Sequence, residues 1–144
     1  MKKSPSEVAT PPPPVARPLN ILIVDDSATM RMVIKRVVEL TEVSIGTVYE
    51  AGNGLEAIKI LERCTVHAVF TDINMPVMNG HELLFEIAQR EQWKHILRIV
   101  ISTDGSRLRQ AEVKELNVHL YIQKPFRPEV VRNALSRIAN ADIH

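Results

Sequence analysis

Three carboxylates, a hydroxyl and a lysine stand where they could perform phosphoryl chemistry together. Each follows or ends a short apolar run, and in chain order they are Asp25, Asp26, Asp72, Ser102 and Lys124. Carboxylates gathered in one crevice repel one another unless a cation neutralises them, and their hard oxygen atoms suit Mg²⁺. A lysine and a hydroxyl beside that cation would stabilise the oxygens of a phosphoryl group. The residue types therefore indicate a magnesium-dependent phosphoryl site.

The elements that must position these residues follow a repeated pattern of strand and then helix. Short apolar runs, rich in β-branched residues, predict strands at 19–24, 47–51, 68–71, 96–102 and 120–123. Apolar residues at helical spacing follow at about 30–40, 55–64, 79–90 and 127–141, and residues 106–116 are predicted to form a polar helix. Parallel strands need such crossovers, and helices on both faces explain strands that are apolar throughout. The sequence predicts an α/β fold with an open, doubly wound, five-stranded parallel sheet.

The carboxyl ends of the predicted strands are the place to expect a ligand, because open α/β sheets bind ligands beyond those ends. Polar groups follow Val24, Thr71, Ile101 and Gln123. The carboxylates, the hydroxyl and the lysine would therefore converge at one edge of the sheet.

The composition predicts one domain behind a tail. Six of the nine prolines lie in residues 1–18, which we expect to form a disordered proline-rich tail, either a spacer or a ligand for an SH3-like partner. Residues 19–144 suffice for one core and are too few for two of ordinary size, so we expect no second catalytic or DNA-binding domain.

Charge, cysteine content and hydropathy predict the compartment. The formal net charge of +1 gives no general attraction to nucleic acid, so we expect no direct nucleic-acid binding. Cys64, the only cysteine, cannot form an intramolecular disulfide, and we expect it to be buried. No apolar run approaches the roughly 20 residues of a membrane span, and no signal peptide is recognisable. We expect a cytoplasmic chain that does not insert into membranes.

Four segments carry a family resemblance, and they are Ile23–Ser27, Asp72–Gly80, Ile101–Thr103 and Lys124–Phe126. In order and spacing they resemble the CheY-like receiver domain of two-component response regulators, over about residues 19–141. The resemblance implies the flavodoxin-like strand order 2-1-3-4-5.

The resemblance also implies roles for the acidic residues. Asp72 would be the phosphoacceptor. Asp26 would bind Mg²⁺ directly and Asp25 more indirectly, through water, while Asp72 and the backbone carbonyl of Asn74 would complete the protein ligands.

Further roles fall on residues near the last two predicted strands. Lys124 and Ser102 would contact the phosphoryl oxygens, although Thr103 offers a second hydroxyl; the spacing to Lys124 favours Ser102. Tyr121 matches the family's switch aromatic, with Ser102 as the other switch residue, and the Lys124–Pro125 bond matches the family's cis peptide.

Two residues at the mouth of the site are expected to set the lifetime of the phosphorylated state. Asn74 and Asp104 lie two residues beyond Asp72 and Ser102, and both could orient the water that hydrolyses the phosphoaspartate. The alternative for Asp104 is to cap the following helix beside Gly105.

The resemblance implies a stand-alone response regulator, a phosphoacceptor rather than an enzyme with turnover. A histidine kinase or phosphotransfer protein would donate the phosphate from a phosphohistidine. A downstream protein would then bind the face formed by residues 106–116, 120–123 and 127–141. The exposed candidates on this face are Arg107, Gln110, Lys114 and Arg132.

Two other functions are considered. A phosphohydrolase of haloacid dehalogenase type also uses an aspartate nucleophile after a strand, but it needs a second aspartate two residues later, where Asn74 stands. A degenerate receiver acting as an unphosphorylated scaffold would not need the intact acidic set.

Overall fold

The computed structural model describes residues 18–143, so almost all of the expected proline-rich tail, residues 1–18, lies outside the described part. The strands are β1 (Leu19–Val24), β2 (Ile45–Ala51), β3 (Ala68–Thr71), β4 (Leu97–Ser102) and β5 (Leu120–Gln123). The helices are α2 (Ala28–Glu39), α3 (Gly54–Arg63), α4 (Gly80–Gln89), α5 (Arg107–Lys114), α6 (Pro128–Ile143) and a 3₁₀ turn, η1 (Glu91–Trp93).

The five strands form one sheet in the order β2-β1-β3-β4-β5, and every neighbouring pair is parallel. This confirms the predicted doubly wound sheet and the order 2-1-3-4-5. All carboxyl ends therefore lie along one edge of the sheet, and β1 and β3 are direct neighbours there, with Val24 opposite Thr71.

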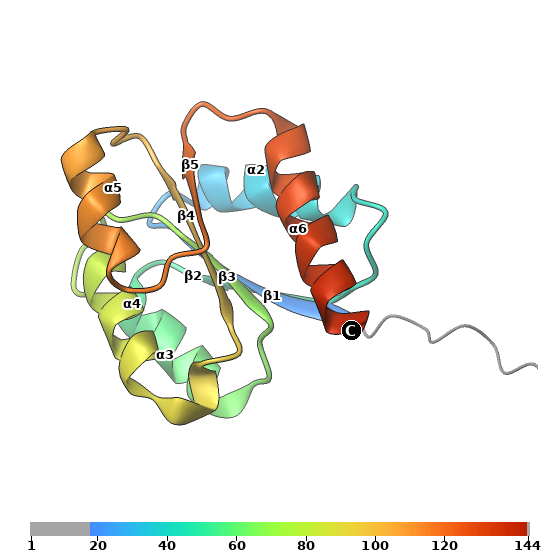
Figure 1. The fold of residues 1–144 in the computed structure, drawn as a ribbon, viewed down its shortest axis with the longest axis horizontal. Helices are drawn as coiled ribbons and strands as arrows, with labels where there is room; N and C mark the ends of the chain where they lie inside the picture. Colours follow the sequence, from blue (N-terminus) through green and yellow to red (C-terminus); the bar gives the residue numbers. More distant parts are fainter. Residues whose placement is uncertain (1–17, 144) are drawn as a thin grey trace, which may run out of the picture.

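Helices cover both faces of the sheet (Figure 1): α2 and α6 lie on one face, and α3, α4 and α5 on the other. Alternate residues of β1 serve the two layers. Ile23 belongs to the core beneath α2 and α6, with Leu135, whereas Leu22 packs with Leu61 of α3. A strand buried on both faces explains why β1 is apolar throughout instead of alternating.

Side-chain caps fix where the helices begin. The side chains of Ser27, Asn53 and Ser106 accept hydrogen bonds from backbone N–H groups in the first turns of α2, α3 and α5. Asn79 and Glu82 form a reciprocal capping box at the start of α4. The loops that carry the polar residues therefore enter their helices at defined positions.

The structure corrects several predicted boundaries. The second strand begins at Ile45 rather than 47, the fourth strand begins at Leu97 rather than 96, and η1 was not predicted. Helix α5 is also shorter than expected and spans 107–114. Past its end, Asn117 adopts the left-handed conformation that favours Asn or Gly, with φ of 60°.

Two sequence expectations concern burial and membranes. Cys64 is half-buried, so the expectation that it is buried was wrong: it is the C-cap residue that follows α3, with extended backbone, and does not lie on the buried face of the helix. Within residues 18–143, no helix is both long enough and apolar enough to cross a membrane.

Candidate functional site

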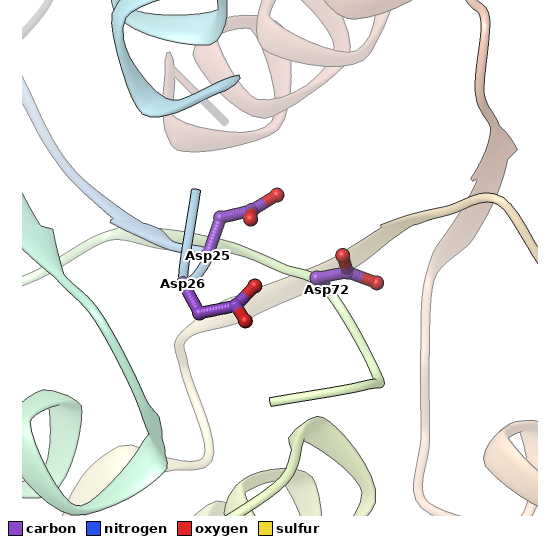
Figure 2. Close-up of side chains that lie close together, drawn as sticks. All are labelled: Asp25, Asp26 and Asp72. Atoms are coloured by element: carbon purple, nitrogen blue, oxygen red, sulfur yellow. The ribbon is translucent and has the colours of Figure 1, made fainter. Parts of the chain in front are cut away.

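Three carboxylates meet at the carboxyl edge of the sheet. Asp25 and Asp26 follow β1, and Asp72 follows the neighbouring β3 (Figure 2). One carboxylate oxygen from each residue lies within 4.8 Å of the others. Three hard oxygen donors at this separation fit a divalent cation such as Mg²⁺, which keeps waters on its remaining positions.

The two aspartates after β1 differ in their surroundings. Asp25 is only 2% exposed, and its Oδ1 accepts a hydrogen bond of 2.9 Å from the backbone N–H of Ser27. Asp26 is exposed. One carboxylate is thus held rigidly by the turn into α2, while its neighbour faces solvent at the mouth of the site.

Lys124 connects the acidic residues of two strands. Its Nζ donates to Oδ2 of Asp25 at 2.9 Å and to Oδ2 of Asp72 at 3.0 Å. Burial by itself would lower the pKa of Lys124, but the hydrogen bonds and charges of Asp25 and Asp72 outweigh it and raise that pKa. The ammonium group therefore stays charged and holds the two carboxylates beside one another.

The loop after Asp72 is held at both of its ends. The backbone N–H of Gly80 donates to the carbonyl of Ile73 at 2.8 Å, and that of Gly54 donates to the carbonyl of Met78 at 2.8 Å. A Cβ at position 80 would collide with the carbonyl oxygen of Asp72, so the close approach requires glycine. These contacts fix the backbone around the phosphoacceptor candidate.

The middle of the same loop contains an unfavourable backbone conformation. Val77 has φ of 69°, and the N–H of Met78 donates to the carbonyl of Pro76 at 2.8 Å, which closes a γ-turn around Val77. A β-branched residue rarely adopts positive φ. Asn74, whose carbonyl is a metal ligand by the family resemblance alone, is exposed on the same loop.

The structure distinguishes the two adjacent hydroxyls at the end of β4. Ser102, the last residue of β4, is fully buried, whereas Thr103, which follows the end of the strand, is exposed. The carbonyl of Ser102 accepts a hydrogen bond of 2.7 Å from the N–H of Lys124, which brings the two backbones together. The Lys124–Pro125 peptide bond is cis, as expected.

Tyr121 is linked to the loop after β4. Its hydroxyl donates to the backbone carbonyl of Asp104, and the N–H of Asp104 donates to Oγ of Ser102 at 3.2 Å. Burial is the main cause that raises the pKa of Tyr121. One loop residue thus contacts both proposed switch side chains, Ser102 and Tyr121.

The Asp104 side chain is engaged with the start of α5. Its Oδ1 accepts from the N–H of Ser106 at 3.0 Å, and its Oδ2 lies 3.5 Å from Nε of Arg109. The hydrogen bond from Ser106 is the main cause that lowers the pKa of Asp104. These contacts support the helix-capping alternative, although Ser106 itself is the N-cap residue.

Arg31 is a neighbour of the site that the sequence analysis missed. Its Nη1 donates to the backbone carbonyl of Asp25 at 2.6 Å, and its Nε donates to Glu50 on β2 at 3.1 Å. The position of Arg31 one turn into α2, on the side that faces β2, could have indicated that it lies near the site. Arg31 was missed because it belongs to no motif.

Comparison with known proteins agrees with this geometry. The model of the family described as "Response regulator receiver domain" matches residues 21–136. The chain belongs to this family. Receiver domains of the CheY-like kind are signalling domains that accept phosphate at an acidic, Mg²⁺-binding pocket, and they interact with histidine kinases and downstream targets.

Relatives of this receiver domain match over most of their length. A chemotaxis protein CheY homolog of Campylobacter jejuni is 35% identical over 121 residues, covering 83% of this chain and 92% of the relative. Chemotaxis protein CheY1 of Helicobacter pylori is 36% identical over 118 residues, covering 81% and 94%. The solved structure of CheY4 of Vibrio cholerae is 26% identical, with a TM-score of 0.75, covering 84% of this chain and 98% of that one.

Proposed function

We propose that Asp72 is the phosphoacceptor of a response regulator that takes its phosphate from the phosphohistidine of a histidine kinase or phosphotransfer protein. The contact of Lys124 with both Asp72 and Asp25 carries this proposal. The Lys124 ammonium group orients the Asp72 carboxylate and places a positive charge where the phosphoryl oxygens would arrive.

Asp25, Asp26 and Asp72 would hold Mg²⁺, together with the backbone carbonyl of Asn74. The separation of the three carboxylates supports this set. When bound, the cation neutralises negative charge on the carboxylates and on the incoming phosphoryl group.

The transfer forms one bond and breaks another. A carboxylate oxygen of Asp72 attacks phosphorus, the phosphorus–nitrogen bond of the donor breaks, and its electron pair returns to the imidazole nitrogen. Lys124 would move its hydrogen bond from Asp72 to a phosphoryl oxygen, and the Ser102 hydroxyl would donate to another. We propose that the chain turns over no other substrate and is not an enzyme apart from its own phosphorylation and dephosphorylation.

Phosphorylation would reach the surface through Ser102 and Tyr121. If the Ser102 hydroxyl turns to the phosphoryl group, its hydrogen bond with the N–H of Asp104 breaks. The backbone carbonyl of Asp104 accepts the hydrogen bond from the Tyr121 hydroxyl, so a movement of Asp104 would also move Tyr121. A local electrostatic change would thus shift the balance between two arrangements of the loop and α5. This chain of contacts supports a two-state switch.

The face formed by α5, β5 and α6 would carry the signal to a downstream protein. The four residues proposed from the sequence are all exposed there: Arg107, Gln110, Lys114 and Arg132. Cationic side chains on this face favour a partner with acidic groups. We do not propose nucleic-acid binding.

Asn74 and Asp104 are proposed to set how long the phosphoryl group stays. Both are polar and short enough to leave room for a water in line with the phosphorus. This proposal requires the Asp104 carboxylate to accept a hydrogen bond from that water in addition to the one that it accepts from the N–H of Ser106.

We further propose that residues 19–144 form the receiver domain behind a proline-rich tail, residues 1–18, and that the chain acts in the cytoplasm without membrane insertion. The match over 21–136 and the single cysteine support these two proposals.

Labelling by acetyl phosphate tests the function. A receiver should gain one phosphoryl group with Mg²⁺ and lose that labelling in EDTA. Steady turnover of free phosphoesters would instead indicate a phosphohydrolase, and no labelling under either condition would indicate an unphosphorylated scaffold.

A further inference from the structure

A basic cleft lies at the amino ends of β4 and β5, at the opposite edge of the sheet from the carboxylates. Arg98 is the second residue of β4, and His119 directly precedes β5. The cleft has a volume of about 580 Å³ and is lined by Ala88, Lys94, Arg98, Lys114, Asn117, Val118 and His119. It is therefore separate from the phosphorylation site.

Arg98 is a buried cation without an acidic partner among the described residues. It is 3% exposed. Its Nη1 donates to the carbonyl of Asn117 at 3.2 Å, and its Nη2 donates to the carbonyls of Lys94 at 3.2 Å and Trp93 at 3.5 Å. Its Nε is buried and has no hydrogen-bond partner within residues 18–143. Burial lowers the pKa of Arg98.

These contacts leave the positive charge only partly compensated. The carbonyl dipoles of Trp93, Lys94 and Asn117 stabilise the guanidinium group, but buried charges in proteins are normally paired with an opposite charge. A guanidinium with N–H groups to spare suits an oxyanion, because its planar donors match the geometry of phosphate oxygens.

The other charged groups that line the cleft have the same sign. Lys94 and Lys114 add two ammonium groups, and none of the seven lining residues is acidic. Lys94 lies 2.8 Å from Glu91, but both side chains are largely exposed, so water weakens that pair and Lys94 is available to a ligand.

His119 adds a neutral donor. Its Nδ1 accepts a hydrogen bond of 3.0 Å from the backbone N–H of Arg98. The neutral ring therefore carries its hydrogen on Nε2, which is left to donate to a ligand.

We propose that this cleft binds a small molecule through a phosphate group, with Arg98, Lys94 and Lys114 supplying charge and His119 a neutral hydrogen bond. The volume exceeds that of a single oxyanion, and Ala88 and Val118 provide an apolar wall. Free phosphate and a phosphate ester both carry the oxyanion that these donors would bind. None of the lining residues belongs to the acidic site, so binding requires neither Mg²⁺ nor a phosphoryl group on Asp72.

The test is an NMR titration of the full chain carrying Asp72→Asn, in EDTA, so that the acidic site cannot contribute. Inorganic phosphate and glycerol phosphate are added separately, with sodium chloride at equal ionic strength as reference. We expect saturable shifts of the Arg98 Nε–Hε and His119 signals. A larger response to glycerol phosphate would identify an ester as the ligand, and an equal response would identify the phosphate group alone.

Variants assign the site. The double variant Lys94→Gln and Lys114→Gln should weaken phosphate binding by about tenfold or more, as expected for loss of charge-assisted contacts. Lys59→Gln, an exposed lysine on α3, is the matched control and should bind like the parent. Shifts that chloride reproduces, or an equal loss in both variants, would overturn the proposal.

Discussion

His119 and Arg98 exchange two hydrogen bonds across the amino ends of β5 and β4. The backbone N–H of His119 donates to the carbonyl of Arg98 at 2.8 Å, and the backbone N–H of Arg98 donates to Nδ1 of the His119 ring at 3.0 Å. His67 and Asn20 repeat this arrangement between β3 and β1, at 2.8 and 2.9 Å. In both places Nδ1 of an imidazole ring accepts the hydrogen bond that a backbone carbonyl would otherwise accept at the start of a pair of parallel strands.

This arrangement makes stability depend on pH. Burial, followed by the charge of Arg98, lowers the pKa of His119 below the ordinary value of 6.5. The unfolded chain then binds a proton more readily than the folded chain, so the stability from neutral His119 is present above pH 6.5 and decreases as the pH falls below it. Urea unfolding between about pH 8 and about pH 5 should show this loss.

The variant His119→Asn isolates that contribution. Asparagine keeps an acceptor near the position of Nδ1 but does not titrate. As the pH falls below 6.5, the free energy of unfolding of His119→Asn should decrease less than that of the parent chain. His67 is present in both proteins, so the difference between them reports on His119. An identical pH dependence in the two proteins would assign the acid sensitivity elsewhere.

Val77→Gly should stabilise the chain. The φ of 69° at Val77 is unfavourable for a β-branched residue by roughly 1–3 kcal/mol, whereas glycine adopts it freely. The greater freedom of glycine in the unfolded chain offsets part of this gain, by about 0.5–1 kcal/mol. We expect a net increase of about 1 kcal/mol in the free energy of unfolding, measured by urea titration. A decrease would show that the exposed Val77 side chain contributes more than its backbone conformation costs.

Asn74→Met and Asp104→Ala should each prolong the phosphorylated state. Each removes a polar group proposed to orient the hydrolytic water, so we expect loss of phosphate from Asp72 to slow by about tenfold. The measurement is the decay of the labelled mass after acetyl phosphate is removed.

Ser106→Ala is the control for Asp104. It removes the N-cap of α5 but leaves the Asp104 carboxylate in place. If Ser106→Ala prolongs the lifetime as much as Asp104→Ala does, the effect comes from helix capping. Unchanged lifetimes in Asn74→Met and Asp104→Ala would contradict the proposal that these two side chains orient the hydrolytic water.

Beryllofluoride, which mimics a phosphoryl group, should shift NMR signals along α5, β5 and the start of α6. The contacts of Ser102 and Tyr121 with Asp104 give the path, and the signals of these three residues should move most. Asp72→Asn should abolish the shifts. Changes confined to α3 and β2 would contradict the proposed signalling face.

Much of the site could be predicted because parallel strands end at one edge. Asp25, Asp72 and Lys124 each follow a strand, so an alternation of strands and helices is enough to place them together. The strand order itself required the family resemblance, because no local feature says that β1 lies between β2 and β3. The difference between Ser102 and Thr103 needed the end of β4, because Ser102 lies within the buried strand and Thr103 lies beyond it.

Two features that the sequence analysis missed involve hydrogen bonds between a side chain and the backbone. The start of β2 was missed because Gly46 disfavours a strand, yet a side chain there would collide with Asn20, whose Oδ1 accepts from the N–H of Thr47 at 2.9 Å. Arg98 passed unnoticed within an apolar strand, because its partners are backbone carbonyls of Lys94, four residues earlier, and of Asn117, 19 residues later. Such contacts belong to the tertiary structure and leave no local periodicity.

Intact-mass spectrometry after treatment with acetyl phosphate and Mg²⁺ tests the central claim most directly. The parent chain should gain the mass of one phosphoryl group, and Asp72→Asn should gain none, because its amide is not a nucleophile for phosphorus. Asp26→Asn is the matched control, which keeps the Asp72 carboxylate and should still be labelled, only more slowly. An unchanged level of labelling in Asp72→Asn would contradict the account.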